Sequence, residues 1–186
     1  MKTIVRLVAT LLLVTASTLL SAQENKISPT KESCLAFVKE FYDWYVPKAR
    51  DINVHSLELA LKDRRSAFSL RLIRGVDAVE SEAMRNQEAG LDFDWILNSQ
   101  DPGDPGDPGY LVSNSRLAAN VCRVDMYRQL SNGKLEKDII PELNFEHGRW
   151  LFVNFHYPDS QFPQSENLLG LIRSYLKPAE DGPKPK

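Results

Sequence analysis

Apolar residues in the N-terminal half of the chain recur with the spacing of amphipathic helices. Ser28, Pro29 and Thr30 suit the first turn of a helix, and Pro47 is expected to end or kink it. Its apolar face is broad enough to need a large partner surface, most simply a β-sheet. The residues on that face, at intervals of three and four, are Cys34, Phe37, Val38, Phe41 and Tyr45.

A second helical region covers residues 56–89, where Gly75 is expected to interrupt the helix and Gly90 to stop it. Residues 77–88 are polar and acidic, which indicates a solvated helix. An arginine cluster in this region could form a patch for an anionic ligand or partner. Because acidic residues interleave with it, a solvated helix face is the simpler interpretation. Its members are Arg64, Arg65, Arg71 and Arg74.

In the C-terminal half the apolar period changes to two, which is typical of β-strands. Two dipeptides with strong turn preference, Asn132-Gly133 and His147-Gly148, predict an antiparallel meander. Strands are expected at 110–113, 117–130, 135–145 and 150–157.

The position of each strand in the sheet follows from its composition. Pro141 indicates a bulge or an edge strand, whereas residues 150–157 are apolar on both faces and favour a central place. Ser165 is expected to cap a final helix with an apolar stripe from Leu168 to Leu176. Helices and strands are thus segregated, which predicts one α+β domain: long N-terminal helices on a curved antiparallel sheet, then a C-terminal helix.

The first 22 residues have the composition of a secretory signal peptide. Lys2 and Arg6 precede an apolar run at 7–20, and small residues follow at the expected cleavage edge. The run is shorter than the about 20 residues of a spanning helix. We therefore predict a periplasmic or secreted protein with no transmembrane span after cleavage. Residues 23–32 are expected to be a flexible linker, 33–177 the domain, and 178–186 a disordered tail.

The chain has two cysteines, Cys34 and Cys122. In an oxidising compartment an even number of cysteines favours a disulfide, and two buried thiols are the alternative. We predict the disulfide.

Charge and motif content exclude several functions. The formal net charge of -2 lacks the basic footprint of a nucleic-acid-binding protein. The three histidines are scattered, and no nucleophile elbow or phosphate-binding loop occurs, so we predict no metal and no cofactor. Three Asp-Pro-Gly units at 101–109 predict a surface loop rather than a calcium site.

Polar residues in two places are candidate ligand-binding groups. Clustered carboxylates in a pocket can perform acid–base chemistry, but aspartates equally serve as turn and cap residues. On the last strand, polar side chains on the face of Trp150 and Phe152 could line a cavity or lie near solvent. The candidates are Asp92, Asp94, Gln100, Asp101, Asn154 and His156.

Three segments together resemble a family of exported bacterial proteins, the domain of unknown function numbered 3828. They are FYDWYV at 41–46, LDFDWILNSQD at 91–101 and GRWLFVNFHYP at 148–158. The resemblance implies a cystatin-like, nuclear-transport-factor-two-like cone, often with a pocket at its open end. It supplies no catalytic residues. The chain departs from the family pattern at Trp95, where proline is frequent.

These observations favour a non-catalytic binding or interaction module, whose partner is another envelope protein or a small ligand. Two alternatives stay open. One is a pocket-based enzyme or small-ligand binder that uses the Asp92/Asp94 region with His156 or Tyr127, and the other is an inhibitor or immunity-type protein. A cavity between the sheet and the first helix would favour the pocket, whereas a filled core with a flat apolar patch would favour protein binding.

Overall fold

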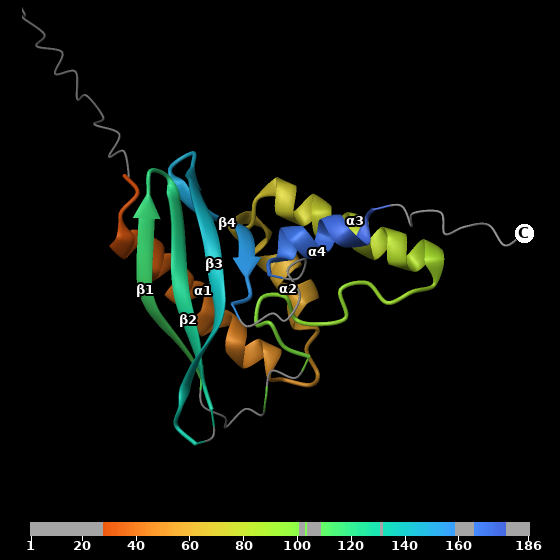
Figure 1. Cartoon of the computed structure of the whole chain (residues 1–186), viewed down its shortest axis with the longest axis horizontal. Coiled ribbons are helices and arrows are strands. Elements are labelled where there is room, and N and C mark those ends of the chain that lie inside the picture. The colour runs from red at the N-terminus through yellow and green to blue at the C-terminus, as the bar shows by residue number, and fades with distance from the viewer. Residues whose placement is uncertain (1–27, 101–102, 104–108, 131, 159–165, 178–186) are drawn as a thin grey trace, which may run out of the picture.

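A computed structural model describes residues 28–100, 103, 109–130, 132–158 and 166–177 (Figure 1). The predicted signal peptide and C-terminal tail lie outside them. The elements in chain order are α1 (Lys31–Ala49), α2 (Ser56–Asp63), the short 3-10 helix η1 (Arg65–Ala67), α3 (Leu70–Asn86), β1 (Tyr110–Ala118), β2 (Val121–Gln129), β3 (Leu135–Glu146), β4 (Arg149–His156) and α4 (Leu168–Tyr175).

The strands form one antiparallel sheet in the order β1-β2-β3-β4, with helices packed on it. The predicted α+β class is confirmed. In Figure 1, α1 crosses behind β1 and β2, while α2, α3 and α4 gather beside β4. Among the described residues, no helix has the length and apolar character needed to cross a membrane.

Helix α1 starts where the sequence predicts. Thr30 and Ser33 form a capping box: the Thr30 hydroxyl accepts from the Ser33 amide at 3.0 Å, and the Thr30 amide donates to the Ser33 hydroxyl at 3.1 Å. The helix therefore already includes the last two residues of the predicted linker. It contains Pro47 and ends two residues later, at Ala49.

A disulfide joins Cys34 of α1 to Cys122 of β2, as predicted. Both residues are fully buried, so the bond ties the helix to the inner face of the sheet. It closes a loop with a sequence separation of 88 residues. Chain-entropy arguments give such a closure about 4 to 5 kcal/mol of stabilisation.

The prediction that Gly75 interrupts the second helical region is wrong. The break lies earlier, where Ser69 caps α3 by accepting from the Leu72 amide at 3.2 Å. Gly75 sits within α3 because α4 approaches there: a Cβ at this position would lie 3.2 Å from two Ile172 carbons. The helix also ends before Gly90, at Asn86, with Gln87 in the left-handed conformation at φ 57°.

The predicted single strand at 117–130 is in fact divided by a tight turn. Ala119 has φ 52° and joins β1 to β2 as a hairpin. Alanine seldom adopts this conformation, so its side chain gives no turn signal. The other two predicted turns are confirmed, with positive φ at Gly133, His147 and Gly148.

Strand β4 is a terminal strand of the sheet, and its predicted central place is wrong. Its apolar composition has a different cause, because helical segments cover its free edge. The Ser69 amide donates to the Phe152 carbonyl at 2.9 Å, and His156 forms a bridge with Asn167. Pro141, by contrast, lies in β3 between two strands, so the edge alternative is wrong for it, and a register shift follows between Glu142 and Leu143.

Aromatic side chains fill the space between α1 and the sheet. Phe41 of α1 contacts Phe152 of β4 with ring centroids 4.8 Å apart, and Phe152 stacks on Phe155 at 5.3 Å. Phe68 and Trp95 extend the cluster, and their exposed fractions are 3% and 2%. Aromatic side chains therefore occupy the space between α1 and the sheet, where a cone-shaped fold would have its pocket.

Candidate functional site

The acidic segment identified in the sequence forms a buried turn (residues 94–99) that closes one end of the core. Trp95, Ile96 and Leu97 are 2%, 0% and 0% exposed. The Asp94 carboxylate accepts from the amides of Ile96 and Leu97 at 2.9 and 3.0 Å. Its main chain exchanges hydrogen bonds with that of Ser99. Asp94 thus organises the turn through its side chain and its backbone.

Four tyrosine hydroxyl groups hold the buried turn. Tyr45 of α1 donates to the second carboxylate oxygen of Asp94 at 2.6 Å. The other three donate to three consecutive main-chain carbonyls. Tyr157, just after β4, donates to Trp95 at 3.0 Å, Tyr42 of α1 donates to Ile96 at 2.8 Å, and Tyr110 of β1 donates to Leu97 at 3.1 Å. Main-chain carbonyls that would be orphaned by burial are thereby satisfied.

Burial shifts the ionisation of these groups. It raises the pKa of Tyr42, Tyr45, Tyr110 and Tyr157 well above the ordinary value, so the hydroxyls stay protonated and act as donors. Burial also raises the pKa of Asp94, although the hydrogen bonds from Tyr45 and the main chain oppose that change. The Asp94 carboxylate thus links its own turn to Tyr45 of α1.

Asp92 and Asp94 line two separate depressions of the surface. Asp92 and Gln100 are exposed, and Asp101 lies outside the described residues. The depression that Asp94 borders lies beside the start of α2, with His55 and Glu58.

Asn154 and His156 face the side of the sheet opposite Trp150 and Phe152, contrary to the sequence-based expectation. Phe152 pairs with the buried Leu143, but Asn154 pairs with Glu142. Val153 is therefore an extra residue in β4, and it moves the following side chains to the other face.

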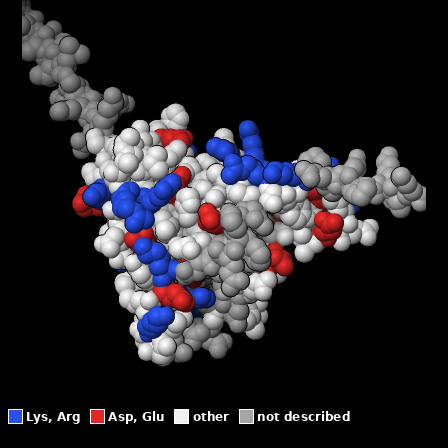
Figure 2. Space-filling view, in the orientation of Figure 1, with Lys and Arg blue, Asp and Glu red and all other residues white. Residues whose placement is uncertain are grey.

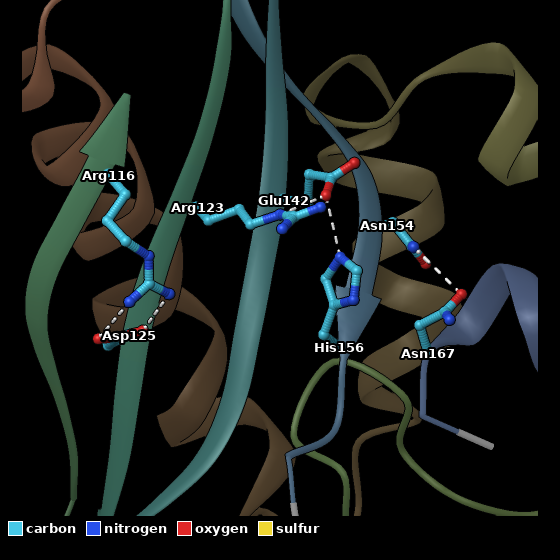
Figure 3. A network of polar contacts seen from close by, with 7 residues as sticks. All are labelled: Arg116, Arg123, Asp125, Glu142, Asn154, His156 and Asn167. Atoms are coloured by element: carbon cyan, nitrogen blue, oxygen red, sulfur yellow. Dashed lines mark hydrogen bonds and ion pairs between the residues drawn. The ribbon is translucent and has the colours of Figure 1, made fainter. Parts of the chain in front are cut away.

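Both side chains have partners on that face (Figure 3). Asn154 supports the start of α4: it donates to the side chain of Asn167 at 3.2 Å and accepts from the Leu169 amide at 3.1 Å. His156 Nε2 lies 3.0 Å from Glu142 Oε2. Asn154 is 7% exposed, so satisfying its polar atoms matters for stability.

Glu142 is the centre of a cross-strand charge network. Arg123 Nε lies 2.6 Å from the same Glu142 oxygen that contacts His156. Burial would raise the pKa of Glu142, but the hydrogen bonds from His156 and Arg123 outweigh it, and the pKa is lowered. On the neighbouring strands Asp125 is bound in the same way, by Arg116 at 2.8 Å and Lys137 at 3.1 Å. Both of these carboxylates are therefore neutralised within the protein.

Next to this network lies a groove of about 840 Å³ (the β4 groove). One wall is formed by the outward side chains of β3 and β4, and the opposite wall by η1, the first turn of α3 and α4. Apolar residues lining it are Phe68, Leu70, Ile73, Leu151, Val153 and Leu169. Charged residues lining it are Arg65, Arg71, Arg149, Glu142 and Glu146.

Of the predicted candidates, neither Asp94 nor His156 lines the β4 groove, although Glu142, the partner of His156, does. Sequence reasoning noted Arg65 and Arg71 as part of an arginine cluster but did not connect them with β4. The one hint in the sequence was that an apolar residue, Leu70, stands next to Arg71. The structure leaves the Leu70 side chain 65% exposed.

Comparison with known proteins gives no match: no family model fits the sequence, and neither a curated protein nor a solved structure is significantly similar to it.

Proposed function

We propose that this chain is an exported, non-catalytic binding protein that takes a small ligand into the β4 groove. The groove itself is the observation that supports this function. Its volume of about 840 Å³ falls in the range of about 300 to 1,000 Å³ that is typical of small-molecule sites. Its lining combines apolar side chains, which can bury a ligand, with charged and polar ones, which can fix the orientation of the ligand.

The disulfide supports export. A Cys34–Cys122 bond that is fully buried and joins two elements is characteristic of proteins that fold in an oxidising compartment. The predicted signal peptide at 1–22 points to the same compartment, the periplasm or the exterior. The family resemblance is compatible with both.

The engagement of the candidate acid–base groups supports binding rather than catalysis. Asp94 accepts two hydrogen bonds from amides of its turn and one from Tyr45 of α1, and Glu142 is bound by Arg123 and His156. A small ligand is favoured over a flat protein partner because the large exposed apolar residues come from separate elements. Ile52, Met84 and Leu111 belong to a loop, a helix and a strand respectively.

Fluorescence titration of the purified, oxidised chain with the neutral apolar dye N-phenyl-1-naphthylamine tests the proposal. We expect saturable binding that Val153→Trp abolishes, because a large ring there fills the floor of the groove. Val121→Trp is the matched control: Val121 is also a strand valine, lies outside the groove and is 36% exposed. It is expected to leave binding unchanged.

A second variant keeps the test decisive if Val153→Trp folds poorly. Leu70→Gln removes apolar surface from the groove at a residue that is already 65% exposed. It is expected to weaken dye binding at an unchanged unfolding temperature. Non-saturable dye uptake, or equal affinities for all four proteins, would overturn the proposed function.

A further inference from the structure

The charges around the β4 groove are unevenly satisfied. Glu142 is bound by the cationic Arg123 and by His156, whereas Glu146, which pairs with Arg149 across the β3–β4 hairpin, accepts from the uncharged Asn144 side chain at 3.2 Å.

Among the three arginines of the groove, Arg65 lies 3.5 Å from Asp77. Arg71 and Arg149 form no ion pair or hydrogen bond through their side chains within the part of the chain that the structure describes. Two cationic groups at the rim of one groove are thus available to a ligand.

The surface view shows the same contrast. Over the strands, basic and acidic side chains alternate, as the Arg116–Asp125 and Arg123–Glu142 pairs require (Figure 2). Over the first part of α3, basic side chains gather, and acidic ones lie further along the helix (Figure 2). Exposed arginines on a helix usually indicate a solvated face. Here Arg71 of α3 and Arg149 of β4 both line a groove with apolar surface.

The apolar floor lies directly beside these cations. Leu70 precedes Arg71 in the first turn of α3, and Leu151 and Val153 follow Arg149 in β4. An apolar floor with a cationic rim is complementary to a molecule that has an apolar chain and an anionic end. Guanidinium groups are particularly suited to that end, because they bind carboxylate and phosphate oxygens in pairs.

We infer that the β4 groove binds an anionic amphiphile, a single apolar chain with a carboxylate or phosphate head group. The chain lies on the floor formed by Leu70, Leu151 and Val153. The head group lies at the rim, where Arg71 and Arg149 receive it. This inference rests on the proposed function and specifies the ligand class of the same groove.

Isothermal titration calorimetry with soluble amphiphiles of one chain length tests the inference. Decanoate and decyl phosphate carry the two anionic head groups, and decyltrimethylammonium carries a cationic one. We expect both anions to bind, and the cation to bind at least about tenfold more weakly, since a tenfold change corresponds to one charge-assisted hydrogen bond. Which anion binds more tightly indicates whether the natural head group is a carboxylate or a phosphate.

Arginine variants locate the head group. Arg71→Gln and Arg149→Gln are each expected to weaken decanoate about fivefold, within the range measured for charge-assisted contacts at partly exposed sites. Arg74→Gln is the matched control, because Arg74 lies three residues after Arg71 on α3, does not line the groove and loses the same charge. It is expected to change the affinity less than twofold.

The outcomes separate the ligand class from the function. Equal affinities for decanoate and decyltrimethylammonium, both abolished by Val153→Trp, would overturn the amphiphile inference while the groove stays a binding site. Equal losses in Arg71→Gln and Arg74→Gln would also overturn it, since the attraction would then be general. Displacement of decanoate by an acidic leucine-rich peptide at lower concentration would indicate a protein partner instead. Failure of the neutral dye to bind would contradict the function itself.

Discussion

The buried turn and the β4 groove are built from similar parts, but they differ in whether their polar groups have partners inside the protein. Each combines apolar side chains with polar groups from elements far apart in the sequence. In the turn, every carbonyl from Trp95 to Leu97 and both oxygens of Asp94 have a partner within the protein. In the groove, neither Arg71 nor Arg149 has an ion-pair or side-chain hydrogen-bond partner among the residues that the structure describes, and Leu70 is 65% exposed.

This difference indicates which polar groups contribute to the stability of the fold and which are available to bind a ligand. A polar group that is satisfied inside the fold contributes to folding and has little left to offer a ligand. The acidic motif is the most conspicuous polar feature of the sequence, yet Tyr45 and two main-chain amides of the turn occupy both oxygens of the Asp94 carboxylate. The groove has no motif, but it retains unsatisfied charge beside apolar surface.

The largest expected effect is loss of stability at high pH through the buried turn. The four tyrosines have raised pKa values in the folded state, so their contribution is fully present below the unfolded-state pKa of about 10 and is lost as pH rises above it. At pH 11 each tyrosine lowers the free energy of unfolding by about 1.4 kcal/mol, so the four together lower it by about 5.6 kcal/mol. Urea unfolding at pH 9 and pH 11 measures the loss.

Phenylalanine variants assign this alkaline effect. Tyr42→Phe removes one titrating group and is expected to reduce the pH-dependent loss by about 1.4 kcal/mol. Tyr127→Phe, on the outer face of β2 and remote from the turn, is the matched control. The same reduction in both variants would mean that the turn is not the source of the alkaline sensitivity.

A somewhat smaller effect is expected from Trp95→Ala. The side chain is 2% exposed and contacts Phe68 and Phe155, so its removal leaves a cavity and lowers the free energy of unfolding by about 3 to 5 kcal/mol. Trp44→Ala is the control, because Trp44 is only partly buried and lies under Lys48 and Arg64 at the surface. Equal losses would show that the buried turn does not dominate the core.

The sequence predicts the local elements well and their long-range arrangement less well. Periodic apolar residues identify α1, and Gly-containing turns locate two of the three hairpins, because these signals depend on near neighbours. Ala119 carries no such signal, and the hairpin between β1 and β2 was therefore missed. Gly75 was misread for the opposite reason: the close approach of Ile172 is a contact between distant segments.

The site was harder to predict than the fold. A single inserted residue, Val153, reverses the faces of Asn154 and His156, and period-two reasoning cannot detect it. The β4 groove joins Arg71 of α3 with Arg149 of β4, which the sequence places far apart. The disulfide could be predicted because the chain offers a single pair of cysteines. The groove offers no comparable constraint.

The smallest expected effect on stability belongs to the groove, and it tests the comparison most directly. Leu70→Gln changes an apolar side chain that is already 65% exposed at the first position of α3, so the free energy of unfolding should change by no more than about 0.5 kcal/mol. The same variant is expected to weaken ligand binding, so stability and binding separate at this residue. Urea denaturation at neutral pH measures the first quantity. A loss of more than about 1.5 kcal/mol would place Leu70 in the cooperative core, where tertiary contacts rather than exposure set the cost. Leu70 would then contribute to the stability of the fold, as the residues of the buried turn do.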